Sequence, residues 1–273
     1  MKKPLANLSE RALGRKRKGP DRSDNDAGLE DIVPQNQSKK IGTLSFPVCD
    51  NMPVRENTFR IEEIIRRRKP ALLLCAGWTV PLIQDLESIV DATKRVNTEV
   101  VLEVGAHGSS PISFRIYGGR QFQMGKQLFG HIGKDFAKGL RSLDEAMPDR
   151  AFTFMHRQAL LLVCGEVMIV ENHGGIGRFR NLVPKTVRDA VTQSSIILNP
   201  THTRMGRPAN LNAWRQFLSK NNRIYMSASN WESPRQHRSP TLHTLWYNGQ
   251  KQEVLRTFEN DFLCYREWHL PKQ

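Results

Sequence analysis

Short runs of apolar residues alternate along the chain with longer segments in which apolar residues recur every three or four positions. The runs are bounded by Gly, Pro or polar residues, which is typical of β-strands buried on both faces. We predict such strands at residues 41–46, 71–76, 98–105, 159–163, 194–198 and 224–228. The longer segments predict helices at residues 57–68, 82–95, 187–191 and 208–219.

Two further patterns predict β-hairpins. Residues 113–117 and 121–124 alternate in polarity around two glycines, and residues 244–247 lead into Asn248 and Gly249, a strong turn signal. Residues 254–270 are strand-like, whereas the polar segment 130–149 predicts a loop with some helix. Alternating strands and helices with intervening hairpins predict an α/β domain with mixed sheets, and no linker interrupts it between residues 41 and 273.

The first 40 residues differ from the rest in composition. They hold few large apolar side chains, so we expect a disordered tail. The tail has ten basic and six acidic residues, including a basic cluster at 15–18, and its charge is therefore +4. The chain has 41 basic and 27 acidic residues in all, a net charge of +14, so residues 41–273 carry +10. This balance favours contact with nucleic acid, and the alternative is a solvated basic surface.

The four cysteines, at positions 49, 75, 164 and 264, form no C-x-x-C pair. The sequence therefore predicts neither a zinc framework nor a disulfide scaffold. We expect no metal and no cofactor. A reducing cytoplasm is the simplest compartment, because no secretory segment begins the chain. No apolar run approaches the length of a membrane span, so no membrane partner is expected.

Cys164 is the candidate for chemistry. It directly follows the apolar run 159–163, and Gly165 and Glu166 come next. In an open α/β layer, reactive groups gather at the carboxyl ends of the strands. A thiol beside the N–H of Gly165 supplies a nucleophile and one oxyanion donor, the minimum for acyl transfer. The alternative is a small core cysteine, since unpaired cysteines are among the most buried residues.

The element order after residue 41 resembles that of the nitrilase superfamily, carbon–nitrogen hydrolases built as an αββα sandwich. That family places a Glu, a Lys and a Cys at three strand ends. Segment 160–166 is similar to its Cys motif, and segment 124–129 follows a hairpin as its Lys motif does. Lys126 and Cys164 are 38 residues apart, which is similar to the family's spacing. The strand–helix–strand between residues 196 and 230 is also similar.

The resemblance implies a mechanism and partners. Cys164 would form a thioester with a small amide or nitrile substrate, while Lys126 and the N–H of Gly165 would stabilise the oxyanion. It also implies a homodimer or higher homo-oligomer.

The chain departs from the family at the first motif. The strand 71–76 leads to Gly77, and the family's Glu position falls on or near this glycine, where the chain has no carboxylate. Glu103 ends the next strand, but only 23 residues separate it from Lys126 and the hairpin uses most of them, so we assign that strand to the family's next one. Three other residues are candidates for a substitute base or for shaping the pocket: His202, His173 and Glu166. Each histidine is alternatively a loop residue bonded locally, and Glu166 alternatively caps a turn.

Three hypotheses follow, of which the third ranks last. The first is a divergent carbon–nitrogen hydrolase acting through Cys164. The second is an inactive nitrilase-fold protein with a binding role, for which nucleic acid at the basic tail and surface is the candidate partner. The third, a metal-dependent nuclease, needs a carboxylate cluster that the sequence does not show.

Overall fold

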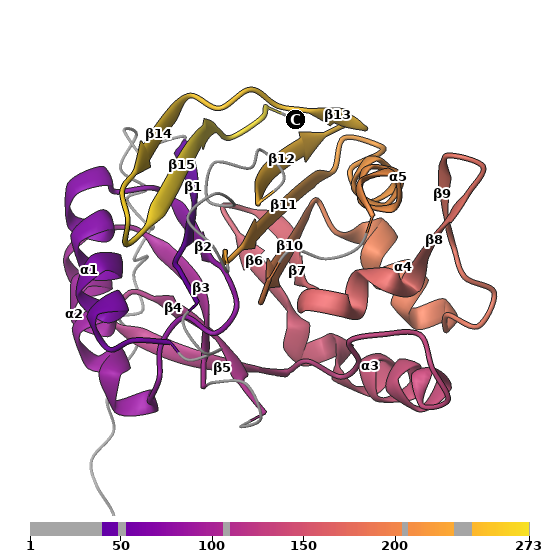
Figure 1. The fold of residues 1–273 in the computed structure, drawn as a ribbon, viewed down its shortest axis with the longest axis horizontal. Coiled ribbons are helices and arrows are strands. Elements are labelled where there is room, and N and C mark those ends of the chain that lie inside the picture. The colour runs from indigo at the N-terminus through magenta and orange to yellow at the C-terminus, as the bar shows by residue number, and fades with distance from the viewer. Residues whose placement is uncertain (1–39, 49–52, 106–109, 204–206, 232–241, 273) are drawn as a thin grey trace, which may run out of the picture. The chain divides into compact units, whose positions relative to one another are not determined.

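Two large mixed β-sheets stacked face to face form the centre of the fold (Figure 1). The computed structural model describes residues 40–48, 53–105, 110–203, 207–231 and 242–272. These residues all belong to one compact unit, Gln37–Gln273. The basic cluster at 15–18 and Cys49 lie outside the described residues.

The first sheet has the strand order β14-β15-β1-β2-β3-β4-β5. Its middle strands β1, β2 and β3 are parallel, β15 runs antiparallel to β1, and β4 and β5 form the predicted hairpin. The bounds are β1 (Lys40–Ser45), β2 (Leu72–Cys75), β3 (Glu99–Val104), β4 (Ile112–Tyr117), β5 (Arg120–Lys126), β14 (Arg256–Glu259) and β15 (Cys264–His269).

The second sheet has the order β13-β12-β11-β10-β7-β6, with β7, β10 and β11 parallel. A separate two-stranded hairpin, β8–β9, packs against helix α5. The bounds are β6 (Ala151–Phe154), β7 (Arg157–Leu161), β8 (Val170–His173), β9 (Ile176–Phe179), β10 (Ile196–Thr201), β11 (Ile224–Ser229), β12 (His243–Tyr247) and β13 (Gln250–Lys251).

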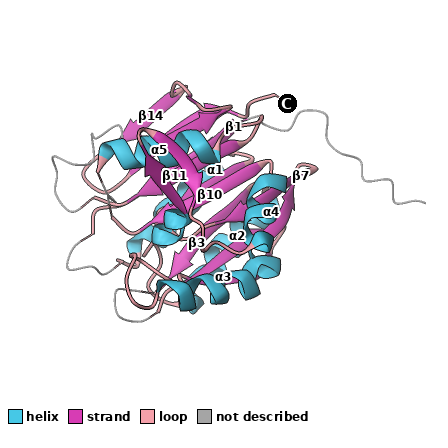
Figure 2. Cartoon of the chain, turned by 90° about the vertical axis from the view of Figure 1, so that its right-hand side faces the viewer, coloured by secondary structure: helices cyan, strands magenta, loops and turns pink. Residues whose placement is uncertain are grey.

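Helices cover the outer face of each sheet (Figures 1 and 2). On the first sheet lie α1 (Glu56–Arg68), the 3-10 helix η1 (Ile83–Leu86) and α2 (Glu87–Arg95). On the second lie α3 (Phe136–Arg150), α4 (Lys185–Gln193) and α5 (Pro208–Leu218), and a second 3-10 helix, η2 (Cys164–Ile169), follows β7. The layers are therefore α, β, β and α, which confirms the predicted sandwich with mixed sheets.

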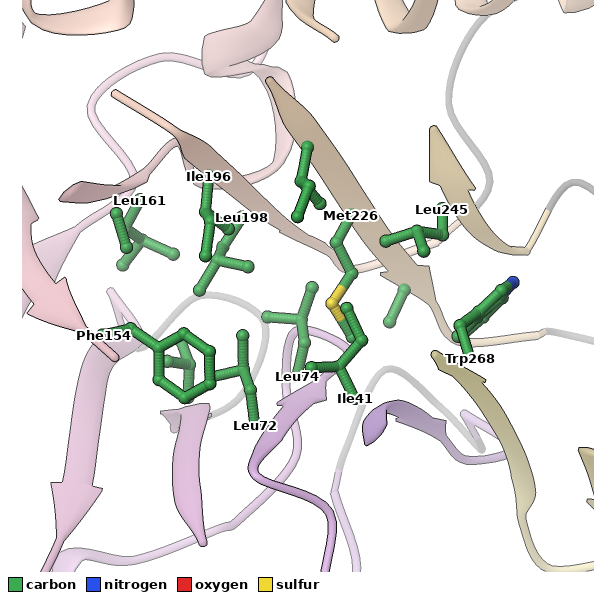
Figure 3. Close-up of a cluster of buried hydrophobic side chains, with 14 of the residues drawn as sticks. Ile41, Leu72, Leu74, Phe154, Leu161, Ile196, Leu198, Met226, Leu245 and Trp268 are labelled. Atoms are coloured by element: carbon green, nitrogen blue, oxygen red, sulfur yellow. The ribbon is translucent and has the colours of Figure 1, made fainter. Parts of the chain in front are cut away.

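Apolar side chains that alternate along the strands hold the layers together. Leu72 and Leu74 of β2 point toward the second sheet and share one core with Leu161 and Leu198 (Figure 3). Leu73, between them in sequence, lies in the core beneath α1 and α2. Because successive side chains of a strand point to opposite faces, both faces of these strands are buried. This explains why the strands read as continuous apolar runs.

The segment 130–149, predicted as mainly loop, is mostly helical, since α3 begins at Phe136. Its core-facing side chains are spaced by three or four residues and are buried: Phe136, Leu140, Leu143 and Met147. The glycine that weakened the helical pattern, Gly139, has a packing reason. A Cβ at position 139 would lie 2.8 Å from the ring of Phe129. The tertiary contact therefore overrides the low helix propensity of glycine.

Candidate active site

Residues at or just after the ends of four strands border one cleft, from β2 and β5 of the first sheet and from β7 and β10 of the second. The cleft has a volume of about 750 Å³. Its lining includes Trp78, Lys126, Gln127, Cys164 and His202. The structure thus brings together three of the residues singled out from the sequence: Lys126, Cys164 and His202.

The alternation along each strand aims the polar side chains between the sheets. Glu103 lies two residues after Val101, which faces the second sheet from β3. His202 directly follows β10, in which Ile196 and Leu198 face the first sheet. It is an even number of residues from both, so its side chain points toward the same sheet. Side chains two residues apart share a face of a strand. Glu103 and His202 therefore approach each other from opposite sheets.

Cys164 stands on a sharp turn between β7 and η2. Its φ is +47°, a conformation that costs free energy for a residue with a Cβ and that clusters at functional sites. The side-chain amide of Asn199 donates hydrogen bonds to the carbonyls of Leu162 (2.6 Å) and Cys164 (3.2 Å). The Tyr225 hydroxyl in turn donates to Asn199 at 2.8 Å. These contacts fix the turn that presents the thiol to the cleft.

Gly165 has no room for a side chain. A Cβ at position 165 would lie 2.7 Å from the Cα of Gly130 and 2.8 Å from its carbonyl oxygen. The backbone of the β5–α3 loop therefore lies directly against the turn at Cys164. Glycine is required here by close approach and not by its φ.

Glu166 is held behind the turn by a fully buried ion pair with Arg150. Its Oε2 accepts from the Val163 N–H at 2.7 Å, and its Oε1 accepts from the Leu128 N–H at 2.8 Å. Arg150 donates to both carboxylate oxygens and to the carbonyl of Lys126. Burial raises the pKa of Glu166, while the charge of Arg150 and the two backbone donors oppose that rise. Glu166 thus ties the Cys164 turn to the end of β5 and lines no part of the cleft.

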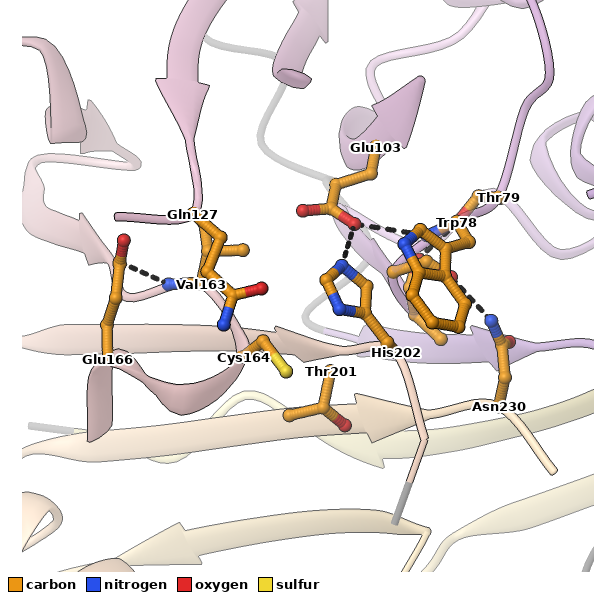
Figure 4. A network of polar contacts seen from close by, with 12 residues as sticks. Trp78, Thr79, Glu103, Gln127, Val163, Cys164, Glu166, Thr201, His202 and Asn230 are labelled. Atoms are coloured by element: carbon orange, nitrogen blue, oxygen red, sulfur yellow. Dashed lines mark hydrogen bonds and ion pairs between the residues drawn. The ribbon is translucent and has the colours of Figure 1, made fainter. Parts of the chain in front are cut away.

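His202 is fixed on three sides (Figure 4). Its Nε2–H donates to Glu103 Oε2 at 2.8 Å, and its ring stacks on Trp78 with centroids 4.2 Å apart and planes 5° from parallel. A further side-chain hydrogen bond joins it to Cys164. Burial alone would lower the pKa of His202, but the hydrogen bonds and negative charges of Cys164 and Glu103 raise it from 6.5 to about 10.

Glu103 belongs to the site, although the sequence interpretation set it aside. Its side chain is fully buried, and its Oε2 also accepts from the Trp78 N–H at 3.0 Å. The separation from Lys126 in sequence was a poor guide, because β2 and β3 are parallel neighbours whose ends reach the same edge. The sequence signal for this role was a Glu at the end of an apolar strand, because Glu is rarely buried unless it is paired.

Lys126 and His173 occupy different surroundings. Lys126 ends β5 and lines the cleft. It lies two residues after buried Met124, on the same face of the strand. His173 ends β8, is exposed and pairs with Ile176 across the β8–β9 hairpin. It does not line the cleft that contains Cys164.

The sequence matches no family model and no curated protein. Solved structures do match. One is a cysteine-to-serine mutant of the Nesterenkonia AN1 amidase from the nitrilase superfamily, with 13% identity over 88% of this chain and 93% of that chain, and a TM-score of 0.54. The chain has the nitrilase-superfamily fold.

A second match is another mutant of the same amidase from Nesterenkonia sp. AN1, with the acetamide moiety of fluoroacetamide added covalently at its active-site cysteine. It shares 14% identity over 88% of this chain and 94% of that chain, with a TM-score of 0.53. At this identity the likeness establishes the nitrilase fold alone. In the described ranges, none of the helices is both long enough and apolar enough to cross a membrane.

Glu166→Ala is expected to destabilise the protein by about 3–5 kcal/mol, because it leaves the Arg150 charge buried without its partner. Chemical denaturation followed by circular dichroism measures this change. Glu171→Ala is the matched control: Glu171 is partly exposed and pairs with Arg178 and Arg180 at the surface. Its loss should cost at most about 1 kcal/mol. Equal effects of the two variants would contradict the role assigned to Glu166.

Cys164 is expected to react with iodoacetamide faster than Cys75 or Cys264 at pH 6 to 8 (about the range in which an ordinary thiol is mostly protonated). His202 hydrogen-bonds to Cys164 and lines the same cleft, and a cationic neighbour favours the reactive form of a thiol. Burial raises the pKa of Cys75, and burial also raises that of Cys264, to about 11. Mass spectrometry of the intact folded protein after timed labelling, followed by peptide mapping, measures each rate. Equal rates for the three cysteines would show that Cys164 is an ordinary core thiol.

Proposed function

We propose that this protein hydrolyses a carbon–nitrogen bond of a small amide through a thioester on Cys164. The observation that carries the proposal is the placement of Cys164, at a turn with φ +47°, in a cleft that it shares with Lys126 and His202. A nucleophile, a cationic group for an oxyanion and a proton carrier are the three parts that acyl transfer needs.

In the first half-reaction the Cys164 thiolate attacks the carbonyl carbon, and the carbonyl π electrons move to oxygen. The tetrahedral intermediate collapses, the C–N bond breaks, and the His202 imidazolium gives its proton to the leaving nitrogen. The products are an amine (ammonia from a primary amide) and a thioester on Cys164. His202 suits this step because its raised pKa keeps it protonated at neutral pH.

In the second half-reaction water attacks the thioester. Once Cys164 is acylated its negative charge is gone, and one of the interactions that raise the His202 pKa is lost with it. Neutral His202 then takes a proton from the attacking water, the C–S bond breaks, and the sulfur leaves as thiolate. A carboxylic acid is released, and His202 is again protonated beside the thiolate. One amide and one water thus give one acid and one amine.

Lys126 and the backbone N–H of Gly165 are the groups we assign to the oxyanion. Lys126 lines the same cleft as Cys164, and its own carbonyl is held by Arg150, which also holds Glu166 behind the Cys164 turn. The buried ion pair therefore fixes the distance between the two strand ends. Preorganised donors of this kind are commonly the largest electrostatic contribution to catalysis.

Short aliphatic amides are the first substrates to test. The cleft is open and its lining is mixed in polarity. A fold neighbour, a cysteine-to-alanine mutant of the Nesterenkonia sp. AN1 amidase, was solved in complex with butyramide. We extend that substrate class to this chain as a proposal.

Cys164→Ala is expected to abolish ammonia release from such amides, because no thioester can form. Lys126→Met should lower kcat by about 10²–10³, the usual cost of removing one oxyanion donor. Ammonia is measured with a coupled glutamate dehydrogenase assay. Lys185→Met is the control, since Lys185 is an exposed lysine on α4 that pairs with Asp189. Full activity of Cys164→Ala would rule out the thioester route.

We also propose, as a second function, that the basic surface binds nucleic acid. The supporting observation is the charge of +14, of which +10 belongs to residues 41–273. The arginines of α1 contribute less than their number suggests, because Arg66 and Arg67 pair with Glu62 and Glu63.

Binding to a fluorescent oligonucleotide, measured by anisotropy, is expected to weaken steeply with salt because bound phosphates release counterions. For about 6–10 phosphate contacts, affinity should fall by about 10³–10⁵ between 50 and 200 mM salt. Neutralising residues 15–18 should reduce the slope in proportion to the charges removed. Absence of binding, or binding insensitive to salt, would contradict this second function.

A further inference from the structure

Glu103 is a buried charge whose ion-pair partner is His202. The Glu103 side chain is fully buried, and among the described residues His202 is the cation in contact with it. Its Oε2 accepts from the His202 ring and from the Trp78 N–H, while its Oε1 accepts from no described residue. A buried carboxylate is stable only when it is paired. The pair therefore favours protonated His202.

Gly77 provides the space that the His202 ring occupies. A Cβ at position 77 would overlap Cδ2 of that ring and would lie 2.7 Å from Glu103 Oε2. The Gly77 N–H donates to the carbonyl of Thr201, the residue before His202, at 2.9 Å. The end of β2 is thus bound to the end of β10, and any side chain at position 77 would displace the histidine.

We infer that Glu103 is a positioning residue that holds His202 as the charged proton partner of Cys164, in the space that Gly77 leaves empty. This inference rests on the proposed hydrolase function. The site then contains a relay of Cys164, His202 and Glu103, drawn from three strand ends. This relay needs no carboxylate at position 77.

The relay follows from the atoms that each group uses. His202 gives Nε2–H to Glu103, so Nδ1 is the nitrogen left to face Cys164 (Figure 4). The stacked Trp78 ring prevents rotation of the imidazole, and the backbone N–H of Trp78 donates to the same carboxylate. No proton needs to move to Glu103. Its charge fixes the ring orientation and favours the imidazolium.

Other charged groups border this relay. Lys126 lines the cleft beside Cys164, and its positive charge acts on the thiol in the same direction as His202. Glu166 and Arg150 lie behind the turn and neutralise each other. A change at Glu103 is therefore distinguishable from a change at Lys126, because only the first alters His202 directly.

The rate of Cys164 alkylation by iodoacetamide from pH 5 to 10 tests the inference without any substrate. In the full-length wild type, reactivity is expected to persist at the acidic end. In Glu103→Gln the isosteric amide removes only the charge, and the rate at pH 6 should fall by about tenfold or more, the value of one hydrogen bond to a charged group. His202→Ala should lose at least as much.

Glu267→Gln is the matched control. Glu267 is buried in the same sheet, on β15, where it accepts from the Tyr265 hydroxyl and pairs with Lys40. Its pH profile should superimpose on that of the wild type. Glu103→Asp, which keeps the charge, should retain more acidic reactivity than Glu103→Gln, and Gly77→Ala should resemble His202→Ala. If Glu103→Gln shows no cooperative thermal transition, and so does not fold, Glu103→Asp and Gly77→Ala are compared with the wild type instead.

The outcomes separate the two proposals. A Glu103→Gln profile identical to wild type, with a shifted His202→Ala profile, would overturn the role of Glu103 and leave the hydrolase intact. Shifted profiles for both variants support the relay. If wild type shows no amide hydrolysis that depends on Cys164, the proposed function fails, whatever the alkylation profiles show.

Discussion

The alternation of side chains in two facing sheets is the constraint on which the site depends. Both faces of the central strands are buried, so each strand must direct every second side chain into the space between the sheets. At the strand ends that space opens into the cleft, and the same parity places Glu103 and His202 opposite each other. A register slip of one residue would replace Glu103 by an apolar neighbour in β3 and His202 by a neighbouring threonine, and it would turn the core side chains of both strands to the wrong face. Fold and site are therefore specified by one pattern.

Two buried ion pairs flank Cys164 and do different work. Glu166 and Arg150 are both fully buried, and the carboxylate also receives two backbone N–H groups, so all its acceptor capacity is used within the protein. Such a pair stabilises one backbone arrangement and has no capacity left for substrate. Glu103 and His202 differ because the histidine lines the cleft and contacts Cys164. Accessibility to the reacting atoms distinguishes a structural pair from a functional one.

The layered fold and most strands could be predicted from the sequence, because buried strands carry strong apolar runs between breakers. Helix α3 could not, since Gly139 weakens its pattern and only the contact with Phe129 explains the glycine. Cys164 and His202 were identifiable from strand-end positions, and Lys126 from the resemblance of segment 124–129 to the family's Lys motif. Glu103 was missed because it was judged by its distance along the chain from Lys126. Its position in the site is decided instead by the pairing of β2 and β3, which are parallel neighbours and end at the same edge. His173 had the same strand-end signal as His202. The strand that it ends, β8, belongs to the separate β8–β9 hairpin and not to either large sheet.

With glycine at position 77, the proton is held on a residue of the second sheet. A carboxylate there would belong to the first sheet and would be negative before the reaction, so it would act first as a base toward the thiol. His202 belongs to the second sheet, and its pKa of about 10 means that it begins the reaction as an acid. It becomes a base only after it has given its proton to the leaving nitrogen. The free protein thus holds the proton on His202, and the buried Glu103 carboxylate is the group that stabilises it there.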